Sequence, residues 1–270
     1  CDSLISIGGG SSHDCAKGVG FVAGNGGRIQ DYEGVDKSNK PFPPYVAVNT
    51  TAGTGSEMTR FCIITDTARK VKMAIIDWRC TPSVAIDDPV LMMGMPPSLT
   101  AATGMDALTH AIEGFTTKAA WEMTDMFHLK AIEIIAKSLR AAVAGEADGF
   151  EGMALGQYVA GMGFSNVGLG IVHSMAHCLG AVYDTPHGVG NAILLPTIME
   201  YNAPVTGDKY KYIAAYMGVE GTENMTVEEY RKAACDAVKQ LSADVGIPAD
   251  LKEIVNPADL DFLAESAFAD

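Results

Sequence analysis

The stretch LISIGGGSSHD, residues 4–14, decides the fold of the first part of the chain. A short apolar strand leads directly into three glycines, and residues 15–21 can continue as a helix. Glycine lets backbone N–H groups approach an anion at the positive end of a helix dipole, so this order is typical of an α/β fold that binds phosphate. The pyrophosphate of a dinucleotide fits such a turn.

The glycine turn taken alone leaves a second interpretation open. The G-x-G-x-x-G fingerprint is incomplete, because His13 stands where the third glycine is expected. Ser11 and Asp14 also form an S-x-x-D pattern, which is typical of an ordinary tight turn with a helix cap.

A second turn, TTAGTGSE at residues 50–57, follows another apolar strand. It brings hydroxyl groups and flexible backbone to the carboxyl end of that strand, where open parallel sheets bind their ligands. A plain polar loop is the alternative, although it does not need so many hydroxyl groups. The two turns together favour a dinucleotide site.

The remaining patterns divide the chain into an α/β part and an all-helical part, with the change after the prolines at residues 96–97. Strands are predicted at residues 4–7, 45–48, 61–65, 72–76 and 84–86. Helices are predicted at residues 99–115, 123–143, 152–166, 171–183, 188–200 (broken or kinked at Pro196), 210–217 and 227–245, the last opened by a capping box from Thr226 to Glu229.

Histidines and one aspartate cluster in the helical part. Asp106 and His110 are four residues apart on one predicted helix, His173 and His177 repeat this spacing on another, and His187 follows a turn. Residues at i and i+4 share a helix face, so each pair can chelate. A mixed oxygen and nitrogen set suits a borderline divalent ion such as Fe²⁺, Zn²⁺ or Mn²⁺.

Two other histidines, His13 and His128, have no such partner in the sequence. A lone histidine in a helix is usually a hydrogen-bonded core residue, and we expect both to be so.

Composition excludes several classes of function. The formal charge of −14, from 19 Lys+Arg against 33 Asp+Glu, argues against nucleic acid as a partner. We find no signal peptide and no apolar run of membrane length, and the six cysteines form no C-x-x-C pair. We expect a cytoplasmic protein with no membrane partner. Because the chain begins inside a strand at Cys1 and stops inside a helical pattern at Asp270, we expect a piece of a longer protein.

The segments GMDALTHAIE (104–113) and GLGIVHSMAH (168–177) resemble the two signatures of the iron-containing alcohol dehydrogenase family. The resemblance runs from end to end of the chain. MALGQYVAGMGFSN (153–166) and YDTPHG (183–188) are most similar to members that act on lactaldehyde and propane-1,2-diol. The resemblance implies a truncated, Rossmann-like dinucleotide-binding domain at residues 1–97 and a helical metal-binding domain at residues 98–270.

The resemblance also implies site residues. Fe²⁺ is expected on Asp106, His110, His173 and His187, with Zn²⁺ as a competitor. His177 is then a candidate proton acceptor or relay, and a packing role is the alternative. The NAD positions implied are Gly8, Gly9, Gly10, Ser11, Asp14, Thr50, Thr51, Thr59 and Lys72.

The expected activity is hydride transfer between NAD and a small alcohol or aldehyde, with the divalent ion as Lewis acid. Two other enzymes combine NAD with a metal: a zinc glycerol dehydrogenase and a dehydroquinate synthase-like lyase. The lyase needs a basic cluster for its anionic substrate, whereas the basic residue nearest in sequence to the ligand segments is Lys118. A non-catalytic metal- and nucleotide-binding remnant is the third alternative. Family members are commonly homodimers or larger, and we expect the same here.

Overall fold

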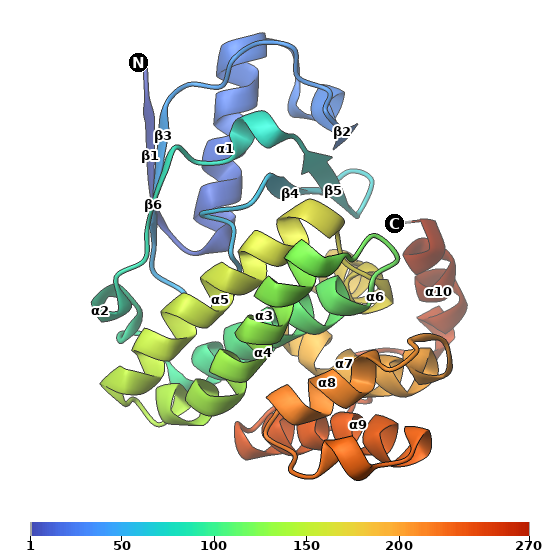
Figure 1. The fold of residues 1–270 in the computed structure, drawn as a ribbon. Coiled ribbons are helices and arrows are strands. Elements are labelled where there is room, and N and C mark those ends of the chain that lie inside the picture. Colours follow the sequence, from blue (N-terminus) through green and yellow to red (C-terminus); the bar gives the residue numbers. More distant parts are fainter. Residues whose placement is uncertain (1, 270) are drawn as a thin grey trace.

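The computed structural model describes residues 2–269, so Cys1 and Asp270, which we placed in a strand and a helical pattern, lie outside the described residues. Strands and helices divide as predicted, into an α/β part followed by a helical part (Figure 1). The strands are β1 (Leu4–Gly8), β2 (Gly34–Val35), β3 (Tyr45–Asn49), β4 (Phe61–Asp66), β5 (Val71–Ile76) and β6 (Val84–Ile86). The helices are α1 (Gly10–Asn25), α2 (Pro89–Met92), α3 (Pro97–Thr116), α4 (Glu122–Val143), α5 (Ala147–Val167), α6 (Ile171–Tyr183), α7 (His187–Asn202), α8 (Lys209–Tyr216), α9 (Val227–Asp244) and α10 (Leu260–Ala269).

The α/β part contains two small sheets. In the first, β1, β3 and β6 run parallel in the order β1-β3-β6, with Gly8 opposite Asn49. The second has the order β2-β5-β4, in which β4 and β5 form an antiparallel hairpin. Helix α1 packs against both β1 and β4, so it joins the two sheets (Figure 1).

Helix α3 is the central element of the helical part and packs against α4, α5 and α7. Small residues allow this close packing. A Cβ on Gly104 would lie 2.2 Å from the Leu139 side chain, and a Cβ on Gly149 would lie 2.2 Å from the backbone nitrogen of Ala142. The main hydrophobic core therefore forms around α3, and a smaller one around Phe21 lies beside the β4–β5 hairpin.

The predicted elements occur in the predicted order, but the structure also contains β2 and α2, which were not predicted, and three further details differ. Helix α5 begins five residues before the predicted start at residue 152, because Gly149 lies inside the helix against α4. Helix α7 continues through Pro196, so a break there was wrong. The cap of Ser11 and Asp14 was also wrong, because α1 begins at Gly10 after Gly9.

The prediction for the start of α9 is confirmed. Thr226 and Glu229 form the expected capping box at the start of α9. Within residues 2–269 no disulfide forms, and no helix is both long enough and apolar enough to cross a membrane.

Candidate metal centre and cofactor site

Four predicted ligands come together between three helices. Asp106 and His110 lie one turn apart on α3, His173 lies near the start of α6, and His187 is the first residue of α7. Each offers one ligand atom, and these atoms all lie within 4.8 Å of one another. The fold thus unites residues that are up to 81 positions apart in a single donor cluster.

The donor cluster is buried and its charge state suits a cation. Asp106, His110 and His173 are buried, while His187 is partly exposed. Burial lowers the pKa of His110 and of His173, which keeps both imidazoles neutral. Burial alone raises the pKa of Asp106, but the surrounding histidines outweigh it and lower that pKa, so the carboxylate is ionised. Neutral imidazole and ionised carboxylate are the forms that bind metal.

Asn191 shows where these ligands converge. Its side-chain nitrogen donates to Asp106 Oδ1 at 2.6 Å and lies 3.1 Å from His173 Nε2 and 3.2 Å from His187 Nε2. One ligand atom from each of Asp106, His173 and His187 therefore faces the amide nitrogen of Asn191. Sequence analysis missed Asn191, although it lies four residues after His187 on the same face of α7.

Glu113 orients one of the ligands. Its carboxylate contacts His173 Nδ1 at 2.7 Å and accepts backbone N–H groups of Gly170 and Val172 at 3.1 and 2.8 Å. The contact leaves His173 Nε2 to face Asp106, and carboxylates commonly hold metal-binding histidines in this way. Sequence analysis gave Glu113 no role, although its i+7 spacing from Asp106 indicates that both side chains share a face of α3.

The residues fit a divalent ion. The donor set is one oxygen and three nitrogens, it contains no sulfur, and the buried His110 Nδ1 has no hydrogen-bond partner among the described residues. Such a set suits Fe²⁺ or Zn²⁺.

The two predicted turns contact each other. A Cβ on Gly9 would lie 2.6 Å from the Thr51 side chain, and one on Gly10 would lie 2.9 Å from the Thr54 side chain. The backbone N–H of Thr50 donates to the Gly8 oxygen at 3.0 Å. Because β1 and β3 are parallel neighbours, both turns leave the same sheet edge, as a ligand site at the carboxyl ends of strands requires.

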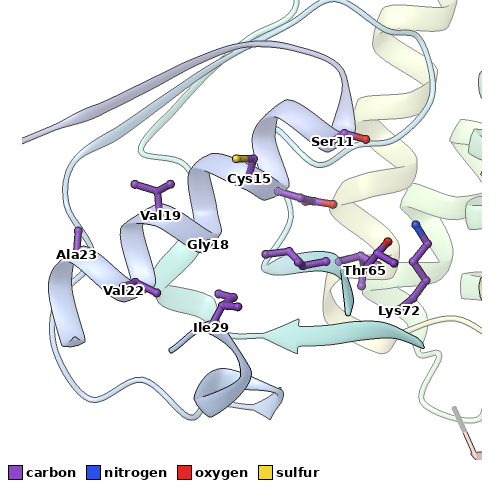
Figure 2. A pocket seen from close by; sticks show the side chains of 12 residues that line it. Ser11, Cys15, Gly18, Val19, Val22, Ala23, Ile29, Thr65 and Lys72 are labelled. Carbon is purple, nitrogen blue, oxygen red and sulfur yellow. The ribbon is translucent and has the colours of Figure 1, made fainter. Parts of the chain in front are cut away.

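A cavity of about 700 Å³ lies between α1 and the β4–β5 hairpin. Figure 2 shows Ser11 and Lys72 toward one end, with Val22 and Ala23 on α1 toward the other. Asp14 also lines this cavity. Three of the predicted cofactor residues, from two different elements, therefore share one cavity.

Lys72 also connects this cavity with the ligand cluster. Burial lowers the pKa of His187 to about 4, the charge of Lys72 makes a smaller contribution in the same direction, and the Lys72 side chain lies near Gly180 on α6. Lys118 is the basic residue nearest to the ligand segments in sequence, but in the fold it is the charge of Lys72 that acts on His187.

Thr59 is buried just after the turn at residues 50–57, which we call the Thr-rich turn. It is not among the residues that line the described cavity. Its carbonyl accepts from Lys17 at 2.9 Å. The Lys17 ammonium also donates to the carbonyls of Ser56 and Phe61 at 2.7 and 2.6 Å, and to Ser56 Oγ at 3.2 Å. The fully buried Lys17 therefore fixes the end of the turn and the start of β4.

The two lone histidines are core residues, as predicted, but only one is hydrogen-bonded. His13 Nδ1 lies 2.7 Å from Ser6 Oγ, and burial lowers the pKa of His13 to about 4. His128 has no hydrogen-bond partner among the described residues, and a Cβ on Gly114 or on Gly163 would lie 2.2 Å from its Nε2. His128 is therefore held by packing.

His177 is half-buried on α6 beside two ligands. Its ring stacks on that of His187 at 5.4 Å between centroids and meets that of His173 edge-on at 6.1 Å. It adjoins the centre without belonging to the four-residue donor cluster.

Two family profiles match the chain. One, described as iron-containing alcohol dehydrogenase, matches residues 1–89, and the other, the C-terminal part of the Fe-containing alcohol dehydrogenase family, matches residues 100–270.

Individual proteins are similar over the whole chain. Lactaldehyde reductase of Escherichia coli is 54% identical over 272 residues, which are 100% of this chain and 71% of the relative. NAD-dependent methanol dehydrogenase of Bacillus methanolicus is 46% identical, with coverages of 100% and 71%. The crystal structure of a 1,3-propanediol oxidoreductase superposes with a TM-score of 0.97 at 48% identity and covers 100% of this chain and 71% of its own.

Proposed function

The chain belongs to the iron-containing alcohol dehydrogenase family, and we propose that it interconverts propane-1,2-diol and lactaldehyde with NAD. Family membership confirms the resemblance seen in the signatures, and NAD-linked oxidoreduction of an alcohol follows from it. The observation that carries the proposal is the donor cluster of Asp106, His110, His173 and His187, and a cavity that three of the predicted cofactor residues line supports it. The similarity to lactaldehyde reductase favours this substrate pair.

The four ligands hold Fe²⁺ in this proposal, with Glu113 fixing the orientation of His173. The bound ion supplies a Lewis acid that lowers the pKa of the substrate hydroxyl. The remaining work belongs to the protein: the helices exclude water from the centre and keep the imidazoles neutral. A bound NAD⁺ would supply the acceptor for the hydride of the carbinol carbon, and the hydroxyl proton would pass to a base on the protein.

The residues of the two turns and of the cavity would hold the cofactor. Gly8, Gly9, Gly10 and Ser11 offer backbone N–H groups and close approach to the pyrophosphate at the start of α1. Thr50 and Thr51 face the same sheet edge, and Asp14 and Lys72 line the cavity. Thr59 contributes indirectly, because its carbonyl accepts from Lys17, which fixes the end of the turn.

Turnover with propane-1,2-diol tests this function. We expect NADH absorbance to rise on mixing NAD⁺, propane-1,2-diol and metal-loaded protein, and to stop rising after chelation. Restoring Fe²⁺ should restore the rate, and kcat/KM should be higher for propane-1,2-diol than for methanol. Full turnover by chelated, metal-free protein would contradict the proposed role of the donor cluster.

His177 accepts or relays the hydroxyl proton in our proposal, because it stacks on His187 at the centre. We expect His177→Ala to lower kcat by about 100-fold, since proton transfer by a positioned side chain contributes at least that much. Metal content per chain should stay unchanged, because the four ligands remain. Steady-state kinetics with metal analysis measures both, and a kcat within about twofold of the wild type would assign His177 to packing.

We also propose a domain boundary at residues 97/98, assembly as a homodimer or larger homo-oligomer, and a cytoplasmic location. These proposals rest on the family resemblance and on composition.

A further inference from the structure

A buried polar cluster that contains none of the metal ligands joins the α/β part to the helical part. It consists of Asn49 at the end of β3, Glu57 at the end of the Thr-rich turn, Asp87 after β6, and Gln157 on α5. Asn49, Glu57 and Gln157 are fully buried, and Asp87 is half-buried. We call these four residues the junction cluster.

Gln157 is the centre of the junction cluster. Its side-chain nitrogen donates to Glu57 Oε1 at 2.7 Å and to Asp87 Oδ1 at 3.1 Å, and its oxygen accepts from the backbone N–H of Gly55 at 2.8 Å. One amide from α5 therefore binds two carboxyl groups and the turn at once. Two carboxyl groups that share one donor nitrogen are close enough to repel when both are ionised.

Glu57 has an unsatisfied oxygen that indicates a proton. Glu57 Oε2 is buried and has no donor among the described residues. Burial and, to a smaller extent, the charge of Asp87 raise the pKa of Glu57 to about 8. Burial also raises the pKa of Asp87, while hydrogen bonds with Asn49 and Glu57 lower it. A proton on Glu57 that faces Asp87 satisfies the orphaned oxygen and removes the repulsion.

The junction cluster reaches the other end of the turn through Asn49. Asn49 Nδ2 donates to Asp87 Oδ1 at 2.8 Å and to the Thr51 carbonyl at 2.8 Å. Asn49 Oδ1 accepts from the backbone N–H of Thr51 at 3.0 Å. Residues 49–57 are thus held at both ends, by Asn49 bonded to Asp87 and by Glu57 bonded to Gln157. Gly55, between these ends, is also bonded to Gln157.

We propose that Glu57 and Asp87 share one proton and that this pair, through Gln157, fixes residues 49–57 in the position that receives the nicotinamide cofactor. The inference rests on the cofactor site proposed above. Glu57 and Gln157 are positioning residues, because they act on the cofactor through the turn. When the shared proton is lost, the Glu57 and Asp87 carboxylates both carry charge beside the Gln157 amide and repel each other. This repulsion breaks the contacts of Gln157 and frees residues 49–57 to move.

Other charged or titratable groups face the carboxyl pair from α1 and α5. The charge of Lys17 on α1 opposes the rise in the pKa of Glu57. Burial, followed by the charges of Asp87 and Glu57, raises the pKa of Tyr158 on α5. The folded-state pKa of Glu57 lies above its ordinary value, so the folded state binds the extra proton. Its contribution to stability is full below the ordinary pKa and is lost as the pH rises through about 8.

Cofactor affinity against pH tests the proposal. For the metal-loaded wild type, we expect the Kd for NADH by calorimetry to be about tenfold larger at pH 9 than at pH 7, because only about a tenth of the molecules keep the proton. In Glu57→Gln an amide replaces the protonated carboxyl and cannot titrate, so the ratio should fall to about one. The control Asp88→Asn changes the neighbouring exposed carboxyl and should keep the tenfold ratio.

A second measurement does not need the cofactor. The backbone N–H of Gly55, which donates to Gln157, should exchange with solvent about tenfold faster at pH 9 in the wild type than in Glu57→Gln. Equal exchange of Gly55 in both proteins, or the same NADH ratio in both, overturns the proposal. If Gly55 behaves as expected and NADH does not bind even at pH 7, the positioning role stands and the proposed cofactor site is wrong.

Discussion

The variant His173→Ala is expected to lose both its bound metal and its turnover. His173 is the most enclosed imidazole of the centre: it contacts Glu113, faces Asp106 and lies between the rings of His110 and His187. Alanine removes one of four ligand atoms and the imidazole partner of Glu113, whose carboxylate keeps its three backbone donors at residues 170, 172 and 173. Because the Lewis acid supplies several kcal/mol of transition-state stabilisation, we expect kcat to fall by at least about 1000-fold.

Metal analysis of protein purified without oxygen measures the first effect, and NADH formation measures the second. Ser174→Ala is the matched control, since it changes the next residue on α6 and leaves the donor cluster intact. The scheme would be wrong if His173→Ala kept full activity without metal.

The variant Lys17→Met is expected to lower the free energy of unfolding by about 3 kcal/mol. Methionine keeps much of the length of the side chain but removes an ammonium that three carbonyls and one hydroxyl accept from. Each buried acceptor left without a partner costs about 1–3 kcal/mol, and relaxation of the turn recovers part of the total. Desolvation raises the pKa of the partly exposed Asp14 and the charge of Lys17 opposes that rise, so the variant also removes a cation that favours the Asp14 carboxylate.

Urea denaturation followed by circular dichroism measures this change. The control is Lys130→Met, because Lys130 is exposed on α4 and its ion pair with Glu133 is of a kind worth at most about 1 kcal/mol. A loss below about 0.5 kcal/mol for Lys17→Met would show that the surrounding oxygens find other donors.

Local patterns were enough to predict the longer elements, but not the two-residue strand β2 or the four-residue helix α2. Alternation and turn residues located β1 and β3, and 3.6-residue periodicity located α3 and α6, because each pattern extends over a single element. The start of α5 was missed because Gly149 looks like a loop residue, whereas its missing Cβ permits contact with α4. Close approach of two helices is a tertiary property that composition does not reveal.

The ligands were predictable because metal chemistry restricts residue type and spacing. Glu113, Asn191 and Gln157 were not predicted, because an amide or a carboxylate in a helix has many ordinary uses. Their importance comes from partners on other elements, such as Gly55 for Gln157 at a separation of 102 residues. Only the fold brings those partners together.

The packing of His128 between α3 and α5 constrains how this protein can change over evolutionary time. Gly114 and Gly163 each leave the space of one Cβ, and the imidazole occupies both spaces. Replacing either glycine by a larger residue requires that His128 is first replaced by a smaller one. Replacing His128 first leaves a void, which persists until one of the glycines is replaced by a larger residue. The three positions therefore form an epistatic group in which the order of substitutions matters, and homologues should differ there together or not at all.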